Sequence, residues 1–442
     1  MHDSMSIRKE SQIRFPWVLV IFLALSFGCL ILLSRGVSSA SRIGCYVLIG
    51  WALFLPTDDL LCLIAAALPT GNIYKLGGGY TAIPFLLLIY IIKTFLKNGA
   101  KLKSDTAKPL LWTVILFSVS VIASMAHGFS IIEIIPFFMH LVFIVVALRI
   151  NHVNEEEKYS ELAFYFIAGT LMVCIGTILF PNVSRSIGNI SIYSKSNPGF
   201  ASTWDFGRSL SISIAFIIVS FLKTKKRLII DIILVFVMLY FLIQCGRFSM
   251  LLGLGALLIC IPFAYGADKP LRQRLLYTVV MIIIIAVLSY VMIRYVYSSM
   301  VELRGYGASE NGRFGVWSTY LEYLGNNPFV VAFGTGGGSI SSVAPTLGVS
   351  TAHNILLEKI IEVGVFGLFL FLLFFITLYR GKTLNPSRNI NVLPLITFLG
   401  TAMTQGTTGN VAFALLLAMC VADKSIEDPE YTEVQNENPV RV

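Results

Sequence analysis

Charged residues are scarce in this chain. Only 13% of its 442 residues are aspartate, glutamate, lysine or arginine, whereas 56% are apolar. Soluble domains usually have about a quarter of their residues charged, so the composition excludes an ordinary soluble fold. The mean hydropathy of +0.80 supports the same conclusion.

The sequence also lacks the patterns of redox, metal and nucleotide sites. Its seven cysteines are scattered without a C-x-x-C pair, which argues against a disulfide framework or a zinc site, and we expect them to pack as small apolar residues. The glycine run at 334–338 has no Gly-Lys-Ser/Thr ending, so it is predicted to be a tight turn close to other backbone and not a P-loop. Neither a metal nor another cofactor is expected.

The abundant feature is a series of apolar blocks, many of them close to the length that crosses a bilayer as helix, about 20 residues. They predict an all-α polytopic membrane protein with 12–14 transmembrane helices in a single integral membrane domain, residues 1–442. The first block is expected to be a retained anchor, because it is too long for a signal peptide. The fourteen candidate spans are 15–33, 43–55, 58–69, 80–97, 109–126, 131–149, 159–180, 208–222, 228–245, 247–265, 275–297, 355–379, 391–405 and 408–422.

Lysine and arginine near the span ends predict the orientation, because they concentrate on the cytoplasmic side. Basic clusters at 97–108, 223–227, 269–274 and 380–388 all become cytoplasmic if the N-terminus is inside. The net charge of +9 is then mostly a topology signal. The expected partner is the lipid bilayer, and no nucleic acid is expected.

Two long loops then fall outside the membrane on the opposite side, at 181–207 and 298–354. The polar tail, 423–442, is predicted to be cytoplasmic and disordered, because it has no apolar periodicity. On the predicted outer side, eight of the eleven basic residues are arginine. Guanidinium matches carboxylate or phosphate oxygens and stays charged when partly buried, so this bias predicts an external site for phosphate or pyrophosphate. The alternative is that these arginines reach lipid headgroups.

Individual residues refine this hypothesis. Arg247 lies between two spans with almost no loop, so its charge is held at the membrane face; Arg294 lies near the outer end of its span. In the smaller loop, Trp204 accompanies Arg185 and Arg208, and aromatic rings beside charged groups suit carbohydrate. An interfacial aromatic belt is the alternative interpretation.

The larger loop contains a predicted amphipathic helix, because Phe314, Trp317, Leu321 and Leu324 recur at helical spacing. We expect it to lie on the outer leaflet, to hold Arg313 at headgroup level and to stop before Pro328. The loop ends at His353. A neutral imidazole suits a general base, and a hydrogen-bonded structural histidine is an equally weighted alternative.

Several of these residues form an ordered set that resembles the O-antigen ligase and O-antigen polymerase (Wzy-type) superfamily. The set is Gly246-Arg247, Arg313 with Trp317, Asn327-Pro328, Gly334 to Gly338, His353-Asn354 to Glu358, Glu362-Val-Gly364 and Gly367. The resemblance covers about residues 245–370. It implies a metal-independent, inverting glycosyltransferase of GT-C architecture with a large periplasmic loop. The implied donor is a glycan on undecaprenyl pyrophosphate.

By position, the resemblance implies that Arg247 and Arg313 bind the pyrophosphate and that His353 activates the acceptor hydroxyl. The further residues expected to bind substrate are Arg304, Arg208, Arg185, Trp204, Trp317 and Arg294. The expected localisation is the bacterial inner membrane, multi-pass, with the active site facing the periplasm. A membrane protein that regulates chain length is an expected partner.

The preferred function is polymerisation of O-antigen or another surface polysaccharide, in which a growing chain moves onto a lipid-linked repeat unit. The alternative within the family is an O-antigen ligase, which transfers the glycan to lipid A-core in lipopolysaccharide biosynthesis. An alternative of another class is a transporter or flippase for lipid-linked oligosaccharides. That class predicts internal repeats, and none is evident.

Overall fold

Helix dominates the fold, and it accounts for 88% of the described residues. The structure is a computed structural model. It describes residues 16–77, 80–98, 104–130, 132, 134–153, 155–180, 183–187, 190–193, 203–224, 227–245, 248–265, 270–291, 313–349, 352, 354–379, 382–383, 390–402, 411–420 and 422–423.

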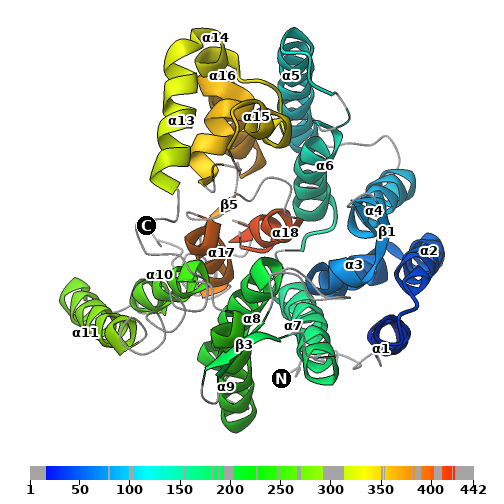
Figure 1. The fold of residues 1–442 in the computed structure, drawn as a ribbon, viewed down its shortest axis with the longest axis vertical. Helices are drawn as coiled ribbons and strands as arrows, with labels where there is room; N and C mark the ends of the chain where they lie inside the picture. The colour runs from blue at the N-terminus through cyan, green and yellow to red at the C-terminus, as the bar shows by residue number, and fades with distance from the viewer. Residues whose placement is uncertain are drawn as a thin grey trace, which may run out of the picture.

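The helices follow one another along the chain (Figure 1). The first half contains α1 (Trp17–Ser34), α2 (Ser39–Phe54), α3 (Thr57–Thr70), η1 (Gly71–Ile73), α4 (Ile83–Asn98), α5 (Ser104–Ala126), α6 (Ile134–Val145), its π-helical continuation η3 (Val146–Ile150) and α7 (Glu156–Leu179). The second half contains α8 (Thr203–Thr224), α9 (Leu228–Cys245), α10 (Phe248–Tyr265), α11 (Leu271–Val291), α13 (Arg313–Asn326), α14 (Pro328–Phe333), α15 (Ile340–Thr346), α16 (Ile355–Leu378), α17 (Leu393–Ala402) and α18 (Val411–Met419).

Short antiparallel strand pairs join some of these helices. They are β1 (Lys75–Gly77) with β2 (Tyr80–Thr81), β3 (Val183–Ile187) with β4 (Ile190–Tyr193), and β5 (Lys382–Thr383) with β6 (Ala422–Asp423). The β3–β4 pair belongs to the smaller predicted loop. The predicted disordered tail lies outside the described residues, apart from Asp423 in β6.

Each of the fourteen predicted spans coincides with a helix, which confirms an all-α polytopic membrane protein in its coarse form. Among the described residues, six helices are long and apolar enough to cross a membrane: α1, α5, α7, α8, α9 and α16. Four more apolar helices are shorter, beginning at Ser39, Ile134, Ser249 and Ile390. Some boundaries differ from the prediction: α5 begins at Ser104 and not at residue 109, and α8 begins at Thr203 and not at residue 208.

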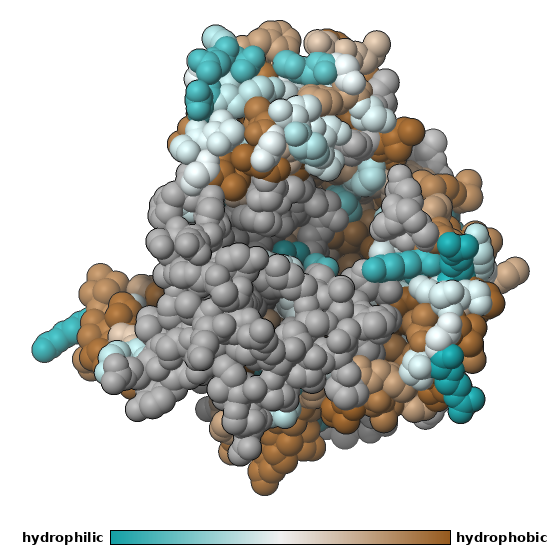
Figure 2. Space-filling model, viewed as in Figure 1, coloured by the Kyte–Doolittle hydropathy of each residue, from teal (hydrophilic) through white to brown (hydrophobic). Residues whose placement is uncertain are grey.

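Apolar side chains are exposed along the helices, as a lipid environment requires. In α9, Ile229 is 73% exposed and Phe236 is 67% exposed, and Leu271 in α11 is 63% exposed. Figure 2 shows hydrophobic residues over α9 and α11, whereas paler and hydrophilic residues gather over α13 and α15.

Polar contacts connect the ends of neighbouring helices. In each case the charge-based topology places both helix ends on the same side of the membrane. Lys223 Nζ lies 2.5 Å from Glu156 Oε1, which joins the end of α8 to the start of α7. Arg149 donates to the carbonyl of Thr377 at 3.1 Å, which joins the ends of α6 and α16. At the other side, Ser41 Oγ donates to the carbonyl of Ile73 at 2.6 Å. This grouping agrees with the alternating path predicted from charge.

The larger predicted loop is substantially helical and has its own core. Tyr320 and Leu324 of α13, Val330 of α14 and Val343 of α15 are buried together with Ile361 of α16. In Figure 1 these four helices lie together beside α5. We call this group the cap, residues 313–349 with the first turns of α16.

The amphipathic helix in that loop is confirmed as α13, and it ends before Pro328 as predicted. Its buried face differs from the expected stripe. Tyr320 is fully buried, whereas Leu321 is 60% exposed. Helical spacing alone predicts which residues share one face of α13. Contacts with α14, α15 and α16 decide which of its faces is buried.

Candidate functional site

A hydrogen bond joins α13 of the cap to the segment just before α16. The indole Nε1 of Trp317 donates to the carbonyl oxygen of Ala352 at 2.6 Å. Trp317 lies one helical turn after Arg313 in α13, and Ala352 directly precedes His353 in the chain. The contact therefore brings together the segments that carry two of the three residues expected to be catalytic.

The start of α16 is fixed by a side-chain cap. Asn354 Oδ1 accepts from the backbone N–H groups of Leu356 at 3.0 Å and Leu357 at 3.2 Å. Such a cap satisfies donors that have no partner inside the helix. It fixes the direction in which the chain enters α16.

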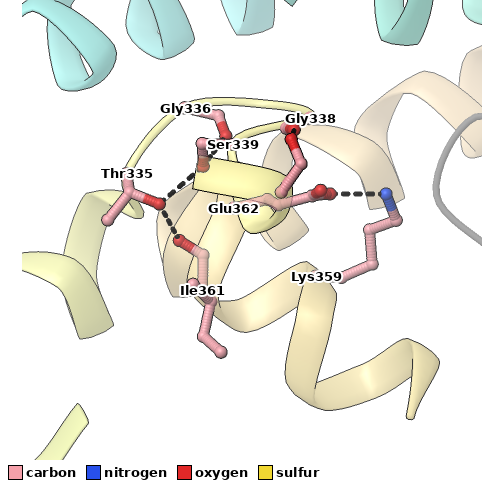
Figure 3. Close-up of polar contacts among 8 residues, drawn as sticks. Thr335, Gly336, Gly338, Ser339, Lys359, Ile361 and Glu362 are labelled. Atoms are coloured by element: carbon pink, nitrogen blue, oxygen red, sulfur yellow. Dashed lines mark hydrogen bonds and ion pairs between the residues drawn. The ribbon is translucent and has the colours of Figure 1, made fainter. Parts of the chain in front are cut away.

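The glycine run is a tight turn packed on α16, as predicted (Figure 3). Gly364 has φ +64°, which interrupts α16 and leaves nearby carbonyls to accept from elsewhere. The backbone N–H of Thr335 donates to the carbonyl of Ile361, and that of Gly336 to the carbonyl of Glu362, both at 2.8 Å. Gly334 and Gly336 have positive φ, and a Cβ on Gly334 would lie 2.4 Å from the Glu362 carbonyl oxygen.

A buried ion pair lies beneath this turn. Lys359 Nζ is 2.7 Å from Glu362 Oε2, and the Glu362 side chain is fully buried (Figure 3). The same ammonium lies 4.4 Å from the ring centroid of Phe137 in α6, and it acts electrostatically on His140, one turn further along α6. The cap and the transmembrane bundle thus share a polar contact on α6.

A second buried carboxylate supports the cap. Glu358 is fully buried, and Tyr320 is fully buried near it. Burial, together with the negative charge of Glu358, raises the pKa of Tyr320 to about 12. The phenol therefore stays protonated at neutral pH and remains a hydrogen-bond donor.

His140 also lines a cavity of about 260 Å³ in the bundle, which we call the Arg208 pocket. Its polar lining consists of His140, Asp205, Arg208, Ser209 and Thr81, and the rest is mainly aliphatic, with Phe166 and three prolines. The first turns of α4, α6 and α8 and the last turn of α3 contribute to its wall. The charge-based topology places these helix ends on the outer side.

Arg208 is held tightly at this pocket. The residue is 6% exposed, its NH1 lies 3.8 Å from Asp205 Oδ1, and its guanidinium carbon lies 5.4 Å from the ring centroid of Phe398. Next to it, a Cβ on Gly207 would lie 2.9 Å from Met250 and 3.7 Å from Cys245. Those two residues belong to α10 and α9, so the first turns of α8 pack against both helices.

Only some of the residues predicted to form the site are among the described residues. His353, Arg247, Arg294 and Arg304 lie outside them, and only the backbones of Arg313 and Arg185 are described. Trp317 contacts Ala352, and Arg208 lines the pocket. Trp204 packs against the main hydrophobic core and does not line the pocket.

Sequence reasoning gave no role to several residues that the fold gathers at this end of the bundle. They are His140 and the ion pair of Lys359 with Glu362. A lone histidine in an apolar span was the available signal for His140. The spacing of Lys359 and Glu362, three residues apart at the head of a helix, permits an ion pair, but burial of that pair depends on α6 and the glycine turn.

All seven cysteines are free, six of them are buried, and they pack among apolar neighbours as predicted. Within the described ranges, no three histidine, cysteine, aspartate or glutamate side chains gather as metal ligands would. Comparison with known proteins adds no relative: no family model, no curated protein and no solved structure matches this chain significantly.

Proposed function

We propose that this protein is a surface-polysaccharide polymerase of the O-antigen type in a bacterial inner membrane. It takes a growing glycan from undecaprenyl pyrophosphate and transfers it to the non-reducing sugar of a lipid-linked repeat unit. The reaction occurs at the periplasmic face, in a helical architecture of the GT-C kind, and inverts the configuration of the anomeric carbon. The donor is already activated by its pyrophosphate, so no nucleotide is required.

The observation that carries this proposal is the hydrogen bond between Trp317 and Ala352. In the sequence, Arg313 and His353 are separated by most of the cap. The bond connects the helical turn after Arg313 to the residue before His353. A base and a cation can act on one substrate only if their backbones lie within reach of each other, and this contact supports that arrangement for Arg313 and His353.

The roles follow from the charge that the reaction develops. As the bond between the anomeric carbon and the pyrophosphate oxygen breaks, negative charge grows on the leaving group, and fixed guanidinium groups at Arg247 and Arg313 stabilise it. His353 accepts the proton of the acceptor hydroxyl as its oxygen bonds to the anomeric carbon. Loss of one such electrostatic donor costs roughly 10²–10³ in rate in comparable sites.

The test uses purified full-length protein in lipid nanodiscs with lipid-linked repeat units and no added nucleotide or metal. We expect a ladder of longer glycans and release of undecaprenyl pyrophosphate. His353→Ala, Arg313→Ala and Arg247→Ala should each slow both. Arg274→Ala, in the first turn of α11 at its predicted cytoplasmic end, serves as the control and should leave the ladder unchanged.

Two outcomes would contradict the proposal. If the three variants still form undiminished ladders, the assignment of these residues to the active site is wrong. If undecaprenyl pyrophosphate is released with none of the acceptors, the protein is not the proposed enzyme. Transfer to lipid A-core in place of the repeat unit would identify the ligase of the same family.

A further inference from the structure

The Arg208 pocket has a balanced set of donors and acceptors. The guanidinium of Arg208 donates, the carboxylate of Asp205 accepts, and the imidazole of His140 can do both. The hydroxyl of Ser209 donates to the backbone carbonyl of Asp205 at 2.9 Å and can accept from a ligand. The positive charge of Arg208 is opposed by Asp205 at 3.8 Å, and that of nearby Lys359 by Glu362 at 2.7 Å. The wall therefore has little net charge and suits a neutral ligand with several hydroxyl groups better than an anion.

The size of the pocket limits the ligand. Its volume of about 260 Å³ gives room for one sugar ring. Aliphatic side chains of Ile212 and Val411 and the ring of Phe166 line the remaining wall. Such surfaces can cover the apolar face of a sugar while its hydroxyl groups meet the polar side chains.

The location connects the pocket to the proposed reaction. Gly207, next to Arg208 in α8, packs against Cys245 of α9 and Met250 of α10, the helices that precede and follow Arg247 in the chain. On the other side, His140 lies one turn from Phe137, which contacts Lys359 of the cap. The pocket thus lies between two parts of the chain that carry residues assigned to the pyrophosphate and the acceptor.

We infer that the Arg208 pocket binds one neutral sugar residue of the substrate glycan, with Arg208 and Asp205 hydrogen-bonded to its hydroxyl groups. This inference rests on the proposed function and names the class of sugar that the enzyme selects. Arg208 is preorganised for the task by Phe398 and Asp205, so little side-chain entropy is lost on binding. Asp205 repels the carboxylate of a uronic acid and so disfavours acidic sugars.

Binding is measured by saturation-transfer NMR on the full chain in nanodiscs. The probes are methyl glycosides of glucose, galactose and mannose, the matching methyl uronosides, and inorganic phosphate as a competitor. We expect at least one neutral glycoside to bind, and its uronoside to bind about tenfold more weakly or not at all. Arg208→Gln and Asp205→Asn should each weaken the neutral glycoside about tenfold, as loss of a hydrogen bond to a charged group does.

Two further variants separate binding from folding. Ala412→Phe places a ring in the pocket wall without removing a polar group, and it should also abolish glycoside binding. Arg149→Gln removes another largely buried arginine, at the opposite end of α6, and should leave binding unchanged. The thermal unfolding midpoint of each variant identifies any that fail to fold, and Ala412→Phe tests the pocket if the Arg208 variant is among them.

Several results would overturn the inference. One is glycoside binding that survives Ala412→Phe. Another is a site that takes phosphate and no glycoside in an Arg208-dependent way, which would make it an anion site. Ladder formation that continues with unchanged sugar selectivity in Ala412→Phe would reject the sugar pocket while the proposed function stands. Absence of all pyrophosphate release would reject the proposed function, whatever the pocket binds.

Discussion

The indole of Trp317 donates to the carbonyl of Ala352 at 2.6 Å, which joins α13 to the segment that precedes α16, although the two lie far apart in the sequence. Ala352 is fully buried, so its carbonyl would not regain a water partner if the indole were lost. The contact therefore fixes the distance between the start of α13 and the start of α16. Both ends of the proposed catalytic set depend on that distance.

Trp317→Phe keeps an aromatic ring and removes the donor. We expect the free energy of unfolding to fall by about 1–3 kcal/mol, because a buried carbonyl is left unsatisfied, and chain growth to slow by about tenfold or more through misplacement of the two segments. Elongation of lipid-linked repeats and thermal unfolding measure the two effects. Trp112→Phe, in α5, is the control; an equal loss of activity there would contradict the special role of Trp317.

Gly364→Ala tests the interruption of α16. Its φ of +64° is unfavourable for alanine, and the added Cβ would lie 2.6 Å from the backbone of Ala332 and Gly334. We expect strong destabilisation, by more than about 2 kcal/mol. Gly315→Ala has open space around its Cβ and a helical position, so it should be neutral or stabilising by up to about 1 kcal/mol. Similar unfolding midpoints for the two variants would show that the turn does not require Gly364.

The Lys359–Glu362 pair predicts strong coupling. Lys359→Met leaves a fully buried carboxylate without its cation, which costs about 3–5 kcal/mol, and adding Glu362→Gln should restore part of that loss. A double-mutant cycle on the free energy of unfolding measures the coupling. The more exposed pair Lys158–Glu161, also three residues apart, should couple by no more than about 1 kcal/mol. Equal coupling in the two pairs would mean that burial does not strengthen the first.

The proposed orientation predicts which residues an impermeant thiol reagent reaches. Glu322→Cys, exposed on α13, should be labelled in intact spheroplasts, whereas Glu157→Cys, exposed in the first turn of α7, should need permeabilised membranes. Native cysteines are buried or partly buried in the structure and give a low background. Labelling in the reverse pattern would invert the topology and place the cap in the cytoplasm.

Much of the fold could be predicted because solubility in lipid dictates it. Each of the fourteen apolar blocks is a helix, and the basic clusters correctly grouped helix ends such as those of α7 and α8. Boundaries were harder near polar residues: Asp205 and Arg208 interrupt the apolar pattern, yet both lie inside α8. Their polar atoms face a pocket and each other, so the helix can start earlier than hydropathy indicates.

The sequence by itself determined the class of protein, the path of its helices and the tight glycine turn, since composition, charge and positive-φ glycines act locally. Only the tertiary structure decided that Tyr320 and not Leu321 is buried, that Trp317 reaches Ala352, and that His140 and Arg208 line one pocket. Those relationships depend on which helix faces meet. Helical periodicity fixes the faces of each helix, but packing between distant segments chooses their partners.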